Sequence, residues 1–152
     1  MGRLSRDKVL DMIRTTVREQ EPDTILNRGN SSSALLLIDL CRVGMIQGYV
    51  APITFANIAY ILRKKSREEI HSTLNRISMH LNILSMDGIQ LKNAIEYGPV
   101  DDFEDMMQYQ CAKAGDCNTI ITNNGKNYKP FSRIPIMNAD EFLSQMLNSA
   151  SE

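Results

Sequence analysis

Residues 45–65 read MIQGYVAPITFANIAYILRKK, and this stretch indicates the class of fold. Met45–Ala51 is a short apolar run between Gly44 and Pro52, which is typical of a strand. Ile53–Lys65 is interpreted as a helix whose basic end lies in solvent. The stretch therefore predicts a strand that leads directly into a helix.

The rest of the chain repeats this alternation of short apolar runs and helical segments. Capping signals, apolar spacing and helix-ending residues predict helices at 5–20, 31–42, 66–79, 87–96, 102–114 and 139–147. Further strands are expected at 83–86, 119–122 and 134–137, and a polar turn at 123–127. Short strands between helices are typical of a parallel sheet that is covered on both faces. We therefore expect a three-layer α/β/α domain with a parallel sheet.

Length and charge restrict the classes of function. At 152 residues the chain is expected to form one domain, because a core of that size needs no disulfide or metal to fold. It carries 17 Lys and Arg against 18 Asp and Glu, and the formal charge of −1 argues against binding nucleic acid or anionic membrane through bulk charge. A local basic groove is compatible with this balance.

Cysteine usage and the first residues indicate the compartment. Cys41, Cys111 and Cys117 are an odd number without zinc-site spacing, and the chain begins with no apolar segment of the secretory type. We therefore expect a reduced, cytoplasmic location. The uncharged run Val43–Leu62 has the 20 residues of a membrane span but contains glycine, proline and amides, so no association with a membrane is expected.

Polar residues follow the expected strands, at the edge where the carboxyl ends of parallel strands form a ligand site. They are Thr54 and Asn57 after the first strand, and Asn124 and Asn127 after the third. An acidic cluster, residues 101–105, lies at the start of the helix at 102–114 and contains four carboxylates.

Two interpretations of the acidic cluster stay open. In the first, Asp102 caps the helix, and the acids after it interact favourably with the positive end of the helix dipole. In the second, Asp102 and Asp105 lie three residues apart on one helix face and contribute to a site for a divalent metal ion. Spacing alone favours the first.

Several segments together resemble the PIN domain, the nuclease fold of VapC-type toxins. They are GYVAPITFANIAYILRK at 48–64, DFED at 102–105, IITNNGKNY at 120–128, and IPIM at 134–137 followed by DEFL at 140–143. We take residues 27–147 as the PIN-like domain, preceded by a divergent segment, 1–26, and followed by a flexible tail, 148–152. The resemblance implies a cluster of acids at the carboxyl edge of the sheet, which holds Mg²⁺ or Mn²⁺ ions that activate water to cleave RNA.

The resemblance also implies roles for individual residues. Asp105 corresponds to the family's third acid and is expected to be the main metal ligand, with Asp102 close by as a second catalytic residue. Asn57 stands where the family often has glutamate, and Asn127 replaces an acid that precedes an aromatic residue. The other residues expected to line the site are Thr54, Thr122 and Asn124.

The family's first acid ends a strand at the middle of the sheet, and this chain departs from the pattern there. Asp23 is followed by threonine, as in the family, but lies too close to the next helix for the usual strand. Asp11 follows apolar residues, in a segment that is interpreted as a helix. Apolar residues at helical spacing favour a helix for residues 8–14 over the family's central strand, and both alternatives stay open.

Two functions are compatible with these residues. One is a metal-dependent endoribonuclease, the toxin of a toxin–antitoxin pair. The other is a catalytically weakened PIN-like module that binds RNA or a partner protein without cleavage, because an amide brings no charge to attract a dication or to acidify water. PIN toxins commonly form homodimers and pair with an antitoxin, so the resemblance implies both partners.

Overall fold

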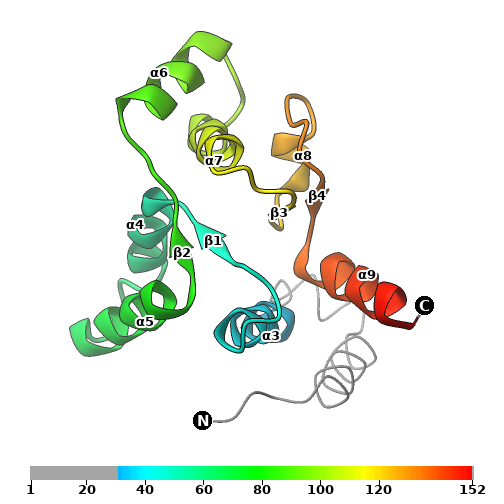
Figure 1. Ribbon diagram of the computed structural model, residues 1–152. Helices are drawn as coiled ribbons and strands as arrows, with labels where there is room; N and C mark the ends of the chain where they lie inside the picture. Colours follow the sequence, from blue (N-terminus) through cyan, green and yellow to red (C-terminus); the bar gives the residue numbers. More distant parts are fainter. Residues whose placement is uncertain (1–30, 152) are drawn as a thin grey trace.

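The computed structural model describes residues 31–151, and in that range helices alternate with short parallel strands (Figure 1). The expected α/β class is therefore confirmed. In chain order the elements are α3 (Ser31–Arg42), β1 (Tyr49–Val50), α4 (Pro52–Ile61), α5 (Arg67–His80), β2 (Asn82–Ile83), α6 (Gly88–Tyr97), α7 (Phe103–Ala114), β3 (Ile120–Ile121), α8 (Gly125–Tyr128), β4 (Ile136–Met137) and α9 (Ala139–Ser151). Among these residues, no helix has the length and apolar character needed to cross a bilayer.

The expectations for the first part of the chain lie outside the described residues. They are the helix at 5–20, the choice between helix and strand for residues 8–14, and the two candidates for the first acid, Asp11 and Asp23.

Side-chain caps start three of the helices where the sequence predicts them. Ser66 caps α5 by accepting a backbone N–H at 3.1 Å, and Asp87 caps α6 in a reciprocal arrangement with Gln90. Asp102 caps α7 in the same way as Ser66 caps α5. These bonds satisfy N–H groups that have no partner within a helix, so the local sequence decides where each helix starts.

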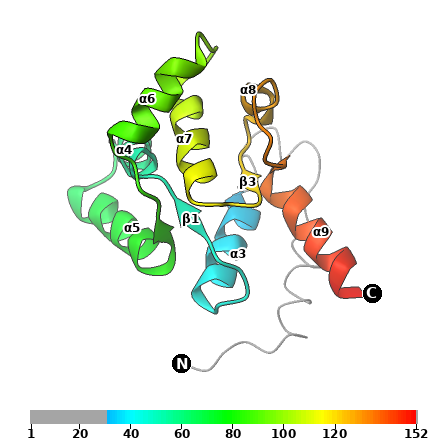
Figure 2. The same cartoon turned by 45° about the horizontal axis from the view of Figure 1, so that its top comes forward.

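The strands are shorter than expected and form two parallel pairs. In the first pair Tyr49 of β1 lies opposite Asn82 of β2, and in the second Ile120 of β3 lies opposite Ile136 of β4. The two pairs lie apart in Figure 1, and the labelled strands β1 and β3 also lie apart in the turned view of Figure 2. Among residues 31–151 no strand joins the two pairs, and the strand that the family pattern places at the middle of the sheet falls before residue 31, outside the described residues.

Helix α7 contributes to the core beside both strand pairs. Met106 and Tyr109 belong to a buried cluster that also includes residues of α6, α8, β3 and β4. Toward the end of the helix, Cys111 packs with Ala51 and Leu84, which follow directly after β1 and β2. A third cluster joins α3 to α9. Helix α7 therefore contributes to two of the three core clusters of the described residues, and α3 with α9 forms the third.

Two segments differ from the structure that their sequence predicts. Residues 123–127 are expected to form a turn, but they contain the start of the short helix α8, which ends at Tyr128 with that ring buried against α7. The last helix continues to Ser151, beyond residue 147, where the sequence predicts its end. Packing against α3 explains the longer helix, because apolar residues of the second half of α9 contact the α3 cluster.

We expect the amides of β3 to alternate in their rates of hydrogen exchange. The N–H groups of Ile120 and Thr122 donate to the carbonyls of Pro135 and Met137 at 2.9 Å, whereas the N–H of Ile121 points to the opposite side of the strand. NMR should therefore show slower exchange at Ile120 and Thr122 than at Ile121. Faster exchange at Ile120 and Thr122 than at Ile121 would contradict the pairing of β3 with β4.

Candidate functional site

The acidic cluster lies at the start of α7, where Asp102 forms the N-cap. Its Oδ1 accepts the backbone N–H of Asp105 at 3.1 Å. An acid at this position also interacts favourably with the positive end of the helix dipole. The structure therefore supports the capping interpretation for Asp102, which fixes the turn that carries Asp105.

Asp105 is buried, with 9% of its surface exposed, and both of its carboxylate oxygens accept hydrogen bonds. Asn127 Nδ2 donates to Oδ2 at 3.0 Å, and the hydroxyl of Tyr128 donates to Oδ1 at 3.1 Å. Each hydrogen bond to a charged group contributes about 1.5–3 kcal/mol to stability. Two donors on α8 therefore stabilise the buried acid and join α8 to α7.

Tyr128 is the most deeply buried member of this arrangement. Its side chain is 2% exposed and packs against Phe131, and its hydroxyl also lies 3.3 Å from Gln108 Oε1. Burial, followed by the negative charge of Asp105, raises the pKa of the phenol far above its usual value. The hydroxyl is therefore protonated at neutral pH and acts as a donor to Asp105.

A second amide–carboxylate pair connects the site to α4. Asn57 Nδ2 donates a hydrogen bond to Glu104 Oε1. Asn57 is half-buried on α4, and Glu104 directly precedes Asp105 in the first turn of α7. The structure thus brings Asn57 to the acidic cluster, where its partner is Glu104 rather than Asp105.

The loop after β3 positions Asn127. Thr122 Oγ1 accepts the backbone N–H of Asn124 at 3.0 Å, and Asn124 is the residue before α8, the helix that carries Asn127. This bond shapes the turn into α8. Thr122 and Asn124 therefore act on the geometry of the site, and within residues 31–151 no hydrogen bond joins them to Asp105.

Thr54 lies on α4 one helical turn before Asn57, so the two share a face of the helix. No side-chain hydrogen bond of Thr54 is present among the described residues; its backbone N–H donates to the carbonyl of Ala51 at 3.0 Å.

The donors of the described residues do not by themselves fit a divalent metal ion. Within residues 31–151, no three His, Cys, Asp or Glu side chains are placed to share one ion. Mg²⁺ takes oxygen ligands, but Asn57 and Asn127 turn their NH₂ groups toward the carboxylates. An acid in place of Asn127 would bring a second negative charge to Asp105, which a cation would offset. With the neutral amide of Asn127 at this position, no cation is needed to offset a second negative charge.

The three cysteines are poor nucleophiles. Cys41, Cys111 and Cys117 form no disulfide, and burial raises the pKa of each thiol. At neutral pH they are thiols rather than thiolates. The carboxylates and amides around Asp105 therefore carry the chemistry of the candidate site.

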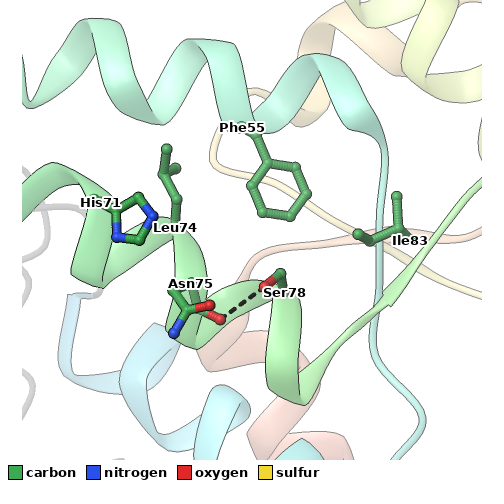
Figure 3. Close-up of a pocket in the computed structure, with 6 residues that line it drawn as sticks. All are labelled: Phe55, His71, Leu74, Asn75, Ser78 and Ile83. Carbon is green, nitrogen blue, oxygen red and sulfur yellow. Dashed lines mark hydrogen bonds between the residues drawn. The ribbon is translucent and has the colours of Figure 1, made fainter.

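A shallow hollow of about 330 Å³ lies elsewhere, between α4 and α5 (Figure 3). Phe55 points from α4 toward α5, and Ser78 Oγ donates to the backbone carbonyl of Asn75 at 2.8 Å. The lining residues are Phe55, His71, Leu74, Asn75, Ser78 and Ile83. Because none of them is a residue of the acidic site, the hollow is separate from that site.

Tyr128 completes the site, although the sequence did not mark it as lining it, and Glu104 of the acidic cluster is the partner of Asn57. One signal for Tyr128 was present in the sequence. By the resemblance, Asn127-Tyr128 stands where the family pattern has Asp-Phe, so a tyrosine takes the place of the phenylalanine. A buried tyrosine needs a hydrogen-bond partner for its hydroxyl. No local signal pairs Glu104 with Asn57, because they lie 47 positions apart.

Replacing Tyr128 by phenylalanine should remove one donor from Asp105 and keep the buried ring. We expect the free energy of unfolding at pH 7 to fall by about 1.5–3 kcal/mol. In the wild type, the unfolded chain loses its phenol protons above about pH 10 while folded Tyr128 keeps its proton, so stability falls as pH rises through that range. Urea unfolding at neutral and alkaline pH should show a smaller alkaline loss in Tyr128→Phe. Equal losses in both proteins would contradict the raised pKa.

Comparison with known proteins agrees with this architecture. A family model described as the PIN domain matches residues 23–126, about two thirds of the 152 residues. The match includes Asn57 and the whole acidic cluster. No curated protein matches the chain. The matched length, together with parallel strands between helices, identifies a fold with nuclease-type function in general, and the chain belongs to the PIN domain family.

Proposed function

We propose that this chain is a PIN domain that binds single-stranded RNA without cleaving it. The observation that carries the proposal is the pairing of Asp105 with Asn127 and Tyr128. Both oxygens of the Asp105 carboxylate accept hydrogen bonds from side chains of the protein. By the resemblance, the family pattern has a metal ligand at this position. Membership of a family of nuclease type supports nucleic acid as the bound molecule.

The charge of the site supports the same proposal. Amides occupy two positions where the family pattern has acids, Asn57 and Asn127, and each donates to a carboxylate on α7. Two negative charges are thereby absent from the site. A dication is attracted less strongly, and a water molecule bound to it is acidified less, when fewer anionic ligands surround it.

A metal-dependent endoribonuclease is the second candidate, and two observations favour it. Asp105 corresponds to the family's third acid by the resemblance of DFED at 102–105. The family match begins at Asp23, one of the two candidates for the first acid. Under this proposal Asp23, rather than Asp11, would join Asp105 and Asp102 in holding Mg²⁺ or Mn²⁺. The protein would then be the toxin of a cytoplasmic toxin–antitoxin pair, with a homodimer and an antitoxin as its assemblies.

A cleavage assay separates the two candidates. Labelled single-stranded RNA is incubated with wild-type protein and with Asp105→Asn, each with Mn²⁺ and with EDTA. We expect wild-type protein to bind the RNA in EDTA and to leave it intact in Mn²⁺, as the variant does. Cleavage by the wild type that both the substitution and EDTA abolish would contradict our proposal and support the nuclease.

Restoring the two acids should create a requirement for metal. We expect calorimetry to show Mn²⁺ binding at least about tenfold tighter in Asn57→Glu/Asn127→Asp than in the wild type, because two carboxylates are added beside α7. Without metal the variant should melt at a lower temperature, because like charges then face each other. Mn²⁺ should raise that temperature by mass action.

The matched control is Asn93→Asp/Gln145→Glu, which adds the same charge at two exposed positions on α6 and α9. Its affinity for Mn²⁺ should remain at the wild-type level. Equal affinities in the control and in Asn57→Glu/Asn127→Asp would show that these amides do not occupy metal-ligand positions.

A further inference from the structure

A basic and aromatic surface lies at the end of α4 and in the connection to α5. Tyr60 and Ile61 are 66% and 72% exposed, although they end an apolar helix. Exposed basic side chains follow them, namely Arg63, Lys64, Lys65 and Arg67. Two acids, Glu68 and Glu69, come next in the first turn of α5. We call residues 60–67 the basic–aromatic patch.

Arg63 and Tyr60 form an ordered pair within the patch. The guanidinium carbon of Arg63 lies 4.2 Å from the centroid of the Tyr60 ring, and its Nη1 donates to the Tyr60 carbonyl at 2.9 Å. A guanidinium group has five N–H donors, so most of them are left for a ligand. In the part of the chain that the structure describes, no carboxylate lies within ion-pair distance of the basic side chains of the patch.

Helix stability accounts for only part of the patch. Residues 63–65 follow the C-terminus of α4, where positive charge interacts favourably with the helix dipole. Arg67, however, is the first residue of α5, where the dipole disfavours positive charge. The dipole also gives no reason for the exposed ring of Tyr60. The helix dipole therefore accounts for neither the charge of Arg67 nor the exposure of Tyr60.

The patch is continuous with the face of α4 that carries Asn57. Tyr60 comes three residues after Asn57, about 5 Å along the helix axis on the same face. Asn57 in turn donates to Glu104 at the start of α7. The patch therefore begins one helical turn beyond Asn57, the residue of α4 that contacts the acidic cluster, so a strand bound at the patch would lie near the candidate site.

We infer that the basic–aromatic patch binds single-stranded RNA, with a base stacked on Tyr60 and phosphates contacted by Arg63 and Lys64. Unpaired bases stack on exposed aromatic rings, and basic side chains neutralise the phosphates beside them. The patch presents both kinds of group within one helical turn. This inference rests on the proposed RNA binding and assigns it to a surface.

Fluorescence anisotropy with labelled single-stranded RNA in EDTA tests the patch. Tyr60→Ala should weaken binding by about tenfold, whereas Tyr60→Phe keeps the ring and should bind as the wild type does. Arg63→Gln/Lys64→Gln should reduce the slope of log affinity against log salt by about 1.4. The matched control, Arg76→Gln/Lys92→Gln, removes the same charge from exposed positions on α5 and α6 and should change the slope little. Circular dichroism should give one melting temperature for all variants.

Heparin, a polyanion without bases, separates stacking from charge. We expect Arg63→Gln/Lys64→Gln to weaken heparin binding and Tyr60→Ala to leave it unchanged. Equal weakening of RNA and heparin binding by Tyr60→Ala would overturn the assignment of a stacked base.

Other outcomes overturn the inference in ways that can be told apart. RNA binding that neither Tyr60→Ala nor Arg63→Gln/Lys64→Gln weakens would exclude the patch and leave the proposed function intact. No RNA binding by the wild type would remove the proposed function and the patch together. A wild-type dimer that Tyr60→Ala dissociates, with unchanged RNA affinity, would show that the patch is an interface between copies of the chain.

Discussion

The buried carboxylate of Asp105 is the interaction on which the rest of the site depends. A charged group that is 9% exposed must find hydrogen-bond donors inside the protein, and α8 supplies them through Asn127 and Tyr128. The ring of Tyr128 is at the same time part of the cluster that packs α7 against α6 and the second strand pair. One side chain therefore joins the chemistry of the site to the core.

The hydrogen bonds around α7 distinguish this site from the acidic cluster that the family pattern implies. Asn57 and Asn127 each donate a hydrogen bond to a carboxylate on α7. These amide N–H groups therefore stabilise the negative charge that a bound cation would otherwise stabilise. Positive charge gathers instead at the end of α4, one turn beyond Asn57. The formal charge of −1 for the whole chain conceals this separation of acids and bases.

Several features of the fold follow from short stretches of sequence. Ser66, Asp87 and Asp102 start their helices because a side-chain oxygen next to a helix accepts an N–H of the first turn. The strands were harder to place. Apolar runs of four to seven residues form strands of two residues, because a strand ends where its neighbour stops pairing and the neighbour is distant in sequence.

The sequence by itself determined the alternation of helices and strands and the PIN family, because these depend on local signals and on the order of motifs. Only the tertiary structure decided which group each side chain meets. Asn57 pairs with Glu104 across 47 positions, and the hydroxyl of Tyr128 pairs with Asp105 across 23. These pairings arise from the packing of α4 and α8 near α7, and no local pattern encodes that packing.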